Sequence, residues 1–299
     1  MQIILFFLVS YVAFVAALNK APQSLSHGQR IPENWKRLSQ AAGLAQQPYC
    51  FTQRKNQTVG DAHLLYEYGD GNLVQRAVIF KSKSLGIVVA FEGTDASSFF
   101  SLLHDLDAKQ VEPNQLFGSA FPPGTKLFKG FQDAYLGVAS HVLQKVKELT
   151  KEHKEQRVTL TGHSLGGAMA LLAAAHFEHE LKQGIYRAYS FGLPRTGNPT
   201  FANAIDHRLK GKFFYAVNGK DCVPHMSSRE NDFQHPSGQI WINGANSSLW
   251  TFYPGQENVH GADSVGKNCT MYDHKGSYFQ TSLGPDPGLC PAIVGSQAH

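Results

Sequence analysis

Residues 158–167, Val-Thr-Leu-Thr-Gly-His-Ser-Leu-Gly-Gly, constrain the fold of this chain more than any other stretch. A short, apolar and β-branched run leads there into a Gly-x-Ser-x-Gly pattern centred on Ser164. The glycines on either side, Gly162 and Gly166, let a strand and a helix approach closely enough for a sharp turn. The sequence therefore predicts a buried strand that passes directly into a helix, with Ser164 at the turn between them.

The flanks decide whether this pattern is more than a glycine-rich turn. By chance alone, Gly-x-Ser-x-Gly is expected in roughly one chain in ten of this length. Here a strand-like run precedes it, and residues 168–177 are apolar nearly all round, as a helix buried under a sheet should be. Both flanks together indicate the nucleophile elbow of a serine hydrolase, with the hydroxyl at the positive end of the helix. The alternative is a structural turn between a core strand and a core helix.

Strand-like and helix-like segments alternate along the chain, which predicts an α/β fold. Such alternation implies a mostly parallel central sheet with helices on both faces, here as one domain over residues 18–299. Function in these sheets gathers where strands end, so the loops 92–95, 162–164 and 218–224 are candidate sites. The expected strands are 64–68, 76–81, 86–91, 157–161, 186–191, 212–217 and one at Trp241, and the expected helices are 35–45, 132–153, 168–177 and 199–209.

The N-terminal residues 3–17 form one apolar run that ends in small residues. A membrane span needs about 20 residues, so the run predicts a signal peptide over residues 1–17, with a membrane anchor as the alternative. No second long apolar run follows. The sequence therefore predicts a secreted, extracellular protein, free or associated with the cell wall, without a transmembrane segment in the mature chain. A net charge of +4 is too small to indicate a nucleic-acid partner.

Four cysteines in a secreted chain predict two disulfides. Three pairings are possible, and we expect Cys50–Cys290 and Cys222–Cys269. The first would tie the start of the domain to its end, and closing so long a loop is worth roughly 5 kcal/mol as an upper bound. Glycosylation sequons, which also arise by chance, mark three asparagines: Asn56, Asn246 and Asn268.

A serine nucleophile needs a histidine to take its proton and a carboxylate to orient that histidine. On this fold the expected order along the chain is serine, acid, histidine. Asp221 follows the predicted strand 212–217 by a short turn, whereas Asp206, Asp232 and Asp263 lie in a helix or in polar loops. Spacing alone leaves four candidates for the base, His225, His235, His260 and His274. A Cys222–Cys269 bridge would hold His274 beside Asp221 and therefore favours it.

Six blocks in one order give the chain a resemblance to the fungal class 3 lipases, an α/β-hydrolase family. The resemblance covers about Arg76 to Gly284. It implies an esterase that acts on lipid at an oil–water interface, with Ser164 as nucleophile, Asp221 as acid and His274 as base. It also implies an oxyanion hole formed by the N–H groups of Leu165 and Thr94, helped by the Thr94 hydroxyl. The blocks are 91–94 (Phe-Glu-Gly-Thr), 124–135, 158–168, 192–203, 217–225 and 272–278.

Residues 96–107 place apolar side chains on one helical face next to the oxyanion loop. The resemblance implies that this segment is a short helical lid over the pocket, and the alternative is a helix packed on the core. Two features depart from the family: Glu92 replaces an Arg that many relatives have, and the segment lacks their Trp. The apolar lid residues are Phe99, Phe100, Leu102, Leu103 and Leu106.

Within this class the chain is most similar to secreted yeast lipases that prefer mono- and diacylglycerols, and we expect that preference. The alternatives are a broader triacylglycerol lipase, an esterase or a phospholipase, and outside the enzymes an inactive hydrolase fold used for binding. We expect no cofactor and no metal, because no His-x-x-x-His or Cys-x-x-Cys pair occurs and His176 and His179 are expected on a helix surface. We expect a monomer.

Overall fold

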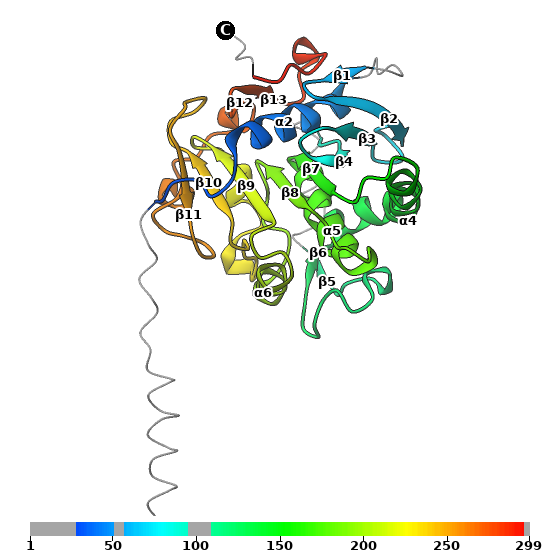
Figure 1. Cartoon of the computed structure of the whole chain (residues 1–299). Helices are drawn as coiled ribbons and strands as arrows, with labels where there is room; N and C mark the ends of the chain where they lie inside the picture. The colour runs from blue at the N-terminus through cyan, green and yellow to red at the C-terminus, as the bar shows by residue number, and fades with distance from the viewer. Residues whose placement is uncertain (1–27, 51–56, 95–108, 296–299) are drawn as a thin grey trace, which may run out of the picture.

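The predicted α/β-hydrolase architecture is confirmed: a nine-stranded sheet carries helices on both faces (Figure 1). The computed structural model describes residues 28–50, 57–94 and 109–295. Strands β4, β7, β8, β9 and β10 are parallel, and the strands outside them pair antiparallel. In order across the sheet the strands are β1 (Thr58–Val59), β2 (Ala62–Tyr68), β3 (Ala77–Ser82), β4 (Gly86–Phe91), β7 (Val158–His163), β8 (Arg187–Phe191), β9 (Phe213–Asn218), β10 (Gln239–Ile242) and β11 (Trp250–Tyr253).

Helices cover both faces because the central strands are apolar at successive positions, and successive side chains of a strand point to opposite faces. In β4, Val89 belongs to the core that contains residues of α4, α5 and α6. Its neighbour Val88 belongs to the core that contains residues of α2. The α-helices in the described residues are α2 (Trp35–Gln46), α4 (Lys129–Glu152), α5 (Leu165–Glu180) and α6 (Pro199–Arg208).

Helix α5 lies beneath the sheet and is itself covered by α4, so it is buried on almost all sides. The prediction that His176 and His179 lie on its surface is wrong for His176, which is 2% exposed. The phenolic hydroxyl of Tyr135 on α4 lies 2.7 Å from His176 Nδ1. Burial lowers the pKa of His176 to about 4. His176 is therefore a neutral core residue, whereas His179 is exposed as expected.

Two smaller sheets lie beside the main one: β5 (Gln110–Val111) with β6 (Leu127–Phe128), and the hairpin β12 (Gly276–Tyr278) with β13 (Thr281–Leu283). This hairpin packs on α2. Both of its turn residues, Phe279 and Gln280, have positive φ (52° and 62°), as a two-residue turn with the right twist requires.

The structure contains the disulfides Cys50–Cys290 and Cys222–Cys269, and both are the pairs expected from the sequence. The first joins the segment after α2 to the C-terminal segment. Within the described ranges, no helix is long and apolar enough to cross a bilayer. The predicted signal peptide, residues 1–17, lies outside those ranges.

Candidate active site

Ser164 occupies the turn between β7 and α5, in a backbone conformation that few non-glycine residues adopt. Its φ is 57° and its ψ is −126°. Tight packing enforces this geometry, since a Cβ on Gly162 would lie 2.1 Å from the carbonyl oxygen of Gly166. A Cβ on Gly166 would lie 2.3 Å from the carbonyl oxygen of Phe91 on the next strand. The Gly-x-Ser-x-Gly pattern is therefore a strained strand-to-helix turn, as predicted.

The Ser164 hydroxyl is buried, and it has no hydrogen-bond partner among the described residues. It lies at the N-terminus of α5, which begins at Leu165. The first N–H groups of a helix lack intrahelical acceptors and form its positive end. The hydroxyl and the N–H of Leu165 thus sit where negative charge is stabilised.

Asp221 and His274 meet beside this turn, 53 positions apart in sequence. The Nδ1 atom of His274 lies 2.9 Å from Oδ2 of Asp221, whose side chain is fully buried. The other carboxylate oxygen accepts the N–H of Val223 at 2.9 Å. Because a carboxylate only accepts, Nδ1 of His274 carries the proton and Nε2 of the neutral ring holds the lone pair. That tautomer is the one a general base needs.

Contacts on both sides of Ser164 hold His274 next to it. The ring of His163, the preceding residue, stacks on the His274 ring with 4.4 Å between centroids. On the other side, the N–H of Ser164 donates to the backbone carbonyl of Phe191. Gly192, which follows Phe191, lies so close to the imidazole that a Cβ on it would be 2.7 Å from Cε1 of His274. The structure thus brings Ser164, Asp221 and His274 together. A nucleophile–base hydrogen bond often tightens only when substrate binds.

His163 also belongs to this site, although no pattern in the sequence singles it out as a functional residue. A carbonyl oxygen only accepts, so the His163 Nε2–H donates to the backbone oxygen of His274, at 2.8 Å. Its Nδ1 then accepts the hydroxyl of Tyr49, also at 2.8 Å. Burial, and next the neighbouring His274, hold the pKa of His163 well below its ordinary value. His163 is therefore neutral and positions the base.

We expect His163→Phe to lower kcat by about tenfold to a hundredfold. The variant keeps a ring against His274. It removes the hydrogen bonds that His163 makes with the His274 carbonyl and the Tyr49 hydroxyl, and each loss costs about 1–3 kcal/mol. His163→Gln, which retains a donor, should recover part of the loss. Steady-state kinetics on a soluble ester, with circular dichroism to check folding, measures the difference. Equal kcat for wild type and the Phe variant would show that His163 does not position the base.

The acid turn and the base loop are joined by more than the Cys222–Cys269 bridge. The side-chain amide of Asn218, the last residue of β9, donates to the backbone oxygen of Asp273 at 3.0 Å. The backbone N–H of Lys220 donates to the Asp273 carboxylate at 2.8 Å. These bonds hold Asp273, which precedes His274, against Lys220, which precedes Asp221. Of these links, only the Cys222–Cys269 disulfide was expected from the sequence.

The loop after β4 lies directly against the elbow. A Cβ on Gly93 would lie 2.5 Å from the carbonyl oxygen of His163. Thr94, the next residue, is partly exposed at this edge, so the predicted oxyanion donors Thr94 and Leu165 come from adjoining segments. Glu92 is buried, and its carboxylate accepts from Arg76 Nε at 3.0 Å. Burial raises the pKa of Glu92, and Arg76 opposes that rise.

Several predicted residues lie outside this cluster. The lid residues Phe99, Phe100, Leu102, Leu103 and Leu106, and the sequon residue Asn56, fall outside the described ranges. Asn246 and Asn268 are exposed, and their glycosylation remains a prediction. The Asn246 side-chain oxygen also accepts the N–H of Ser277 at 2.6 Å. Of the other candidate bases, His260 is exposed, whereas His225 and His235 belong to a separate buried network.

The chain is similar to known lipases both in sequence and in structure. The chain is 50% identical over 266 residues to a secreted mono- and diacylglycerol lipase of Malassezia restricta, covering 89% of this chain and 88% of the relative. Among solved structures, it is similar to a lipase from Rhizopus microsporus var. chinensis (TM-score 0.74, 26% identity, 89% of this chain and 95% of that one). It is also similar to a triacylglycerol lipase described as having a serine protease triad at its catalytic centre (TM-score 0.71, 26% identity, 87% and 98% covered).

The family match falls on the part of the chain that carries the elbow and the acid. Residues 88–231 match the family described as Lipase (class 3). This range includes the loop after β4, Ser164 and Asp221, while His274 lies beyond it. The extended similarity to the Malassezia lipase covers most of the chain. The chain belongs to the class 3 lipase family and is a carboxylic ester hydrolase.

Proposed function

We propose that this chain is a secreted serine lipase that hydrolyses acylglycerols through Ser164, His274 and Asp221, with a preference for mono- and diacylglycerols. The observation that carries the proposal is the His274–Asp221 bond of 2.9 Å beside a serine held in an elbow. The Malassezia relatives are named as secreted lipases of mono- and diacylglycerols, which supports both the substrate preference and secretion.

The proposed reaction proceeds through an acyl-enzyme. Ser164 Oγ attacks the ester carbonyl while His274 Nε2 takes the hydroxyl proton, and Asp221 stabilises the imidazolium that forms. The ester C–O bond then breaks, and His274 gives its proton to the leaving alkoxide of the glycerol part. A water molecule then attacks the acyl carbon while the same His274 takes one of its protons. The bond from the acyl carbon to Ser164 Oγ breaks, His274 returns the proton to Oγ, and the fatty acid leaves.

The oxyanion of each tetrahedral intermediate needs donors where the negative charge develops. We propose the N–H groups of Leu165 and Thr94, together with the Thr94 hydroxyl. The position of Leu165 at the start of α5 supports the first, and the packing of the Gly93 backbone against His163 supports the second. One such donor is typically worth about 3 kcal/mol of activation free energy.

A panel of lipid substrates tests the proposed specificity. We expect the secreted protein to hydrolyse mono- and diolein at least about tenfold faster than triolein, dioleoyl phosphatidylcholine or a short soluble ester, a difference of about 1.4 kcal/mol in activation free energy. Ser164→Ala, assayed in parallel, corrects for contaminating lipases. Equal rates on diolein and triolein would instead identify a broader triacylglycerol lipase, and rates confined to the soluble ester would identify an esterase.

The action at an oil–water interface, the lid at residues 96–107 and the monomeric state remain predictions. A rise in rate as monoolein passes its solubility limit would support an interfacial lid. A rate that follows simple saturation through that limit would argue against it.

A further inference from the structure

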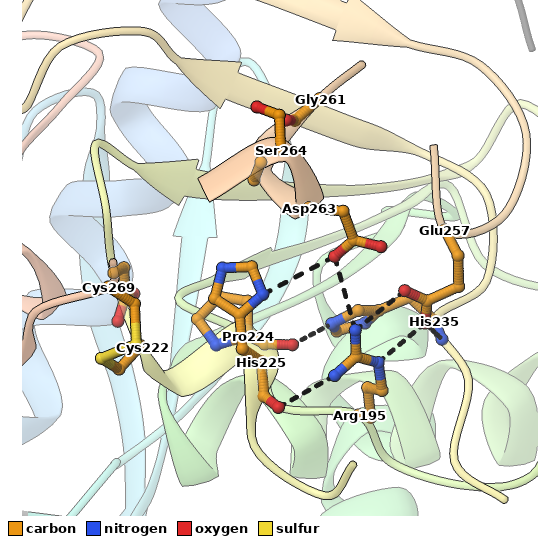
Figure 2. A network of polar contacts seen from close by, with 12 residues as sticks. Arg195, Cys222, Pro224, His225, His235, Glu257, Gly261, Asp263, Ser264 and Cys269 are labelled. Carbon is orange, nitrogen blue, oxygen red and sulfur yellow. Dashed lines mark hydrogen bonds and ion pairs between the residues drawn. A yellow bond between two sulfur atoms is a disulfide. The ribbon is translucent and has the colours of Figure 1, made fainter. Parts of the chain in front are cut away.

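A largely buried cluster of charged and titratable side chains lies beside Pro224, close to the Cys222–Cys269 disulfide (Figure 2). We call it the Arg195 cluster. It consists of Arg195, His225, His235, Glu257 and Asp263. The side chains of Arg195 and Glu257 are only 5% and 6% exposed. The proposed reaction uses none of these groups, although two of them touch the backbone just beyond the acid.

The cluster holds the short helix that follows Asp221, η3 (Val223–His225). Arg195 Nη1 donates to the backbone oxygen of His225 at 2.9 Å. His235 Nε2, facing a carbonyl that only accepts, donates to the backbone oxygen of Pro224 at 2.8 Å. The N–H that begins η3, that of Val223, donates in turn to the Asp221 carboxylate. The cluster therefore fixes the acid through its own peptide segment.

The cluster contains two carboxylates and a single guanidinium. Arg195 binds Glu257 with two parallel bonds of 2.8 Å and 2.9 Å. Nη2 of Arg195, which donates one of these bonds, also lies 3.4 Å from Oδ1 of Asp263. Nδ1 of His225 lies 3.6 Å from the same Asp263 oxygen. One positive charge cannot compensate two negative charges that are largely withdrawn from water, with 6% of the Glu257 side chain and 12% of the Asp263 side chain exposed. A buried charge without a partner costs several kcal/mol. A charge-neutral cluster therefore needs one additional proton.

Several groups around Asp263 decide where that proton resides. Burial, and next the bond and charge of Glu257, raise the pKa of Asp263 to about 7. Burial alone would raise the pKa of Glu257, but the bonds from Arg195 lower it. Burial lowers the pKa of both imidazoles, that of His235 to about 4. The charged and titratable groups that face the cluster from neighbouring elements are Arg229, Tyr215 and Asp221.

We propose that the Arg195 cluster is a proton-dependent clamp that positions Asp221. With one proton shared by the Glu257–Asp263 pair, the cluster is neutral and η3 is held by Arg195 and His235. Without that proton, the cluster carries a net negative charge away from water. Because an uncompensated buried charge is unfavourable, Asp263 and Arg195 then move toward solvent. The bond from Arg195 to His225 is then weakened, and Asp221 loses part of its support.

The sign of the pH effect follows from the raised pKa of Asp263. The proton on Asp263 contributes its full stabilisation below pH 3.8, the ordinary pKa of an aspartate. This stabilisation is lost as the pH rises through about 7, the raised pKa of Asp263 in the folded protein. Glu257, whose pKa is lowered, contributes in the opposite sense and only in acid. From about pH 5 to pH 8 the free energy of unfolding should therefore fall because of Asp263.

Asp263→Asn tests the clamp, because the amide resembles the protonated acid and cannot ionise. The melting temperature of the variant minus that of wild type should rise by about 3 °C or more between pH 5 and pH 8. Asp61→Asn is the matched control. Asp61 is also partly buried and hydrogen-bonded, to Ser84 at 2.9 Å, but lies outside the cluster. Its difference from wild type should stay constant. An equally constant difference for Asp263→Asn would overturn the proposal.

Hydrogen–deuterium exchange of the unmodified protein reports on the clamp directly and needs no variant to fold. After correction for the intrinsic pH dependence, peptides covering 221–226 should lose protection between pH 6 and pH 8.5, while β4 should not. Constant protection would contradict the clamp. The effect on catalysis rests on the proposed role of Asp221, but melting and exchange do not involve the reaction. Failure of the clamp and failure of the lipase assignment are thus separate results.

Discussion

Ser164→Ala is expected to lower kcat for ester hydrolysis by about 10⁵- to 10⁶-fold, the size of loss seen when a triad nucleophile is removed. The reason is chemical, because Ser164 supplies the hydroxyl at the N-terminus of α5, and the ring of the preceding residue, His163, stacks on His274. The fold should not suffer. The hydroxyl has no hydrogen-bond partner among the described residues, so the free energy of unfolding should change by less than about 0.5 kcal/mol.

Ser190→Ala is the matched control for this variant. Ser190 is also buried, at the carboxyl half of β8, and its hydroxyl donates to the backbone oxygen of Gly167 in α5 at 2.9 Å. Its removal should cost about 1 kcal/mol of stability and leave most of the activity. Initial rates on a soluble ester and thermal unfolding measure both quantities. Turnover by Ser164→Ala within tenfold of wild type would exclude Ser164 as the nucleophile.

Asp221→Asn is expected to lower kcat by about 10⁴-fold, as in serine hydrolases whose acid is replaced by its amide. The amide oxygen should keep the bond from the Val223 N–H, which leaves the amide NH₂ facing His274 Nδ1. Nδ1 must then accept, and the ring proton moves to Nε2. A ring protonated at Nε2 cannot take the proton of Ser164, so the base is lost although its position is kept.

Asp273→Asn separates this effect from a general loosening of the site. Asp273 adjoins His274, and its carboxylate accepts the backbone N–H of Lys220. We expect at most about a tenfold loss from that variant. If Asp221→Asn lost no more kcat than Asp273→Asn, the acid of the triad would have to be sought elsewhere.

The central fold was predictable because its strands are long enough to show a pattern. Strands β4, β7 and β9 have six buried residues each; β4 and β9 are mostly apolar, and β7 begins with alternating β-branched and apolar residues. Strands of two or three residues, such as β1 and β12, are too short for a period-2 pattern to appear. His176 was misplaced even though its helix is apolar nearly all round. Because such a helix is buried on almost all sides, a polar residue on it is expected in the core, hydrogen-bonded to another side chain. For His176 that side chain is Tyr135.

The elbow could be recognised locally, but the rest of the site depends on contacts between distant segments. Spacing left four histidines open, and the bridge Cys222–Cys269 favoured His274, which the structure places against Asp221. The bond between Tyr49 and His163 joins residues 114 positions apart, and no local pattern signals it. The same holds for Arg195 and Glu257, which are separated by 62 positions.

Covalent labelling with a fluorophosphonate tests the central claim most directly, because the probe reacts only with a serine activated by a working base. The protein is incubated with the probe, with and without nonionic detergent micelles, and is analysed by intact mass and peptide mapping. We predict a single adduct on Ser164 in the wild type, none in Ser164→Ala, and slow labelling in Asp221→Asn. An adduct on another residue, or no adduct in either condition, would contradict the assignment of Ser164 as the catalytic nucleophile.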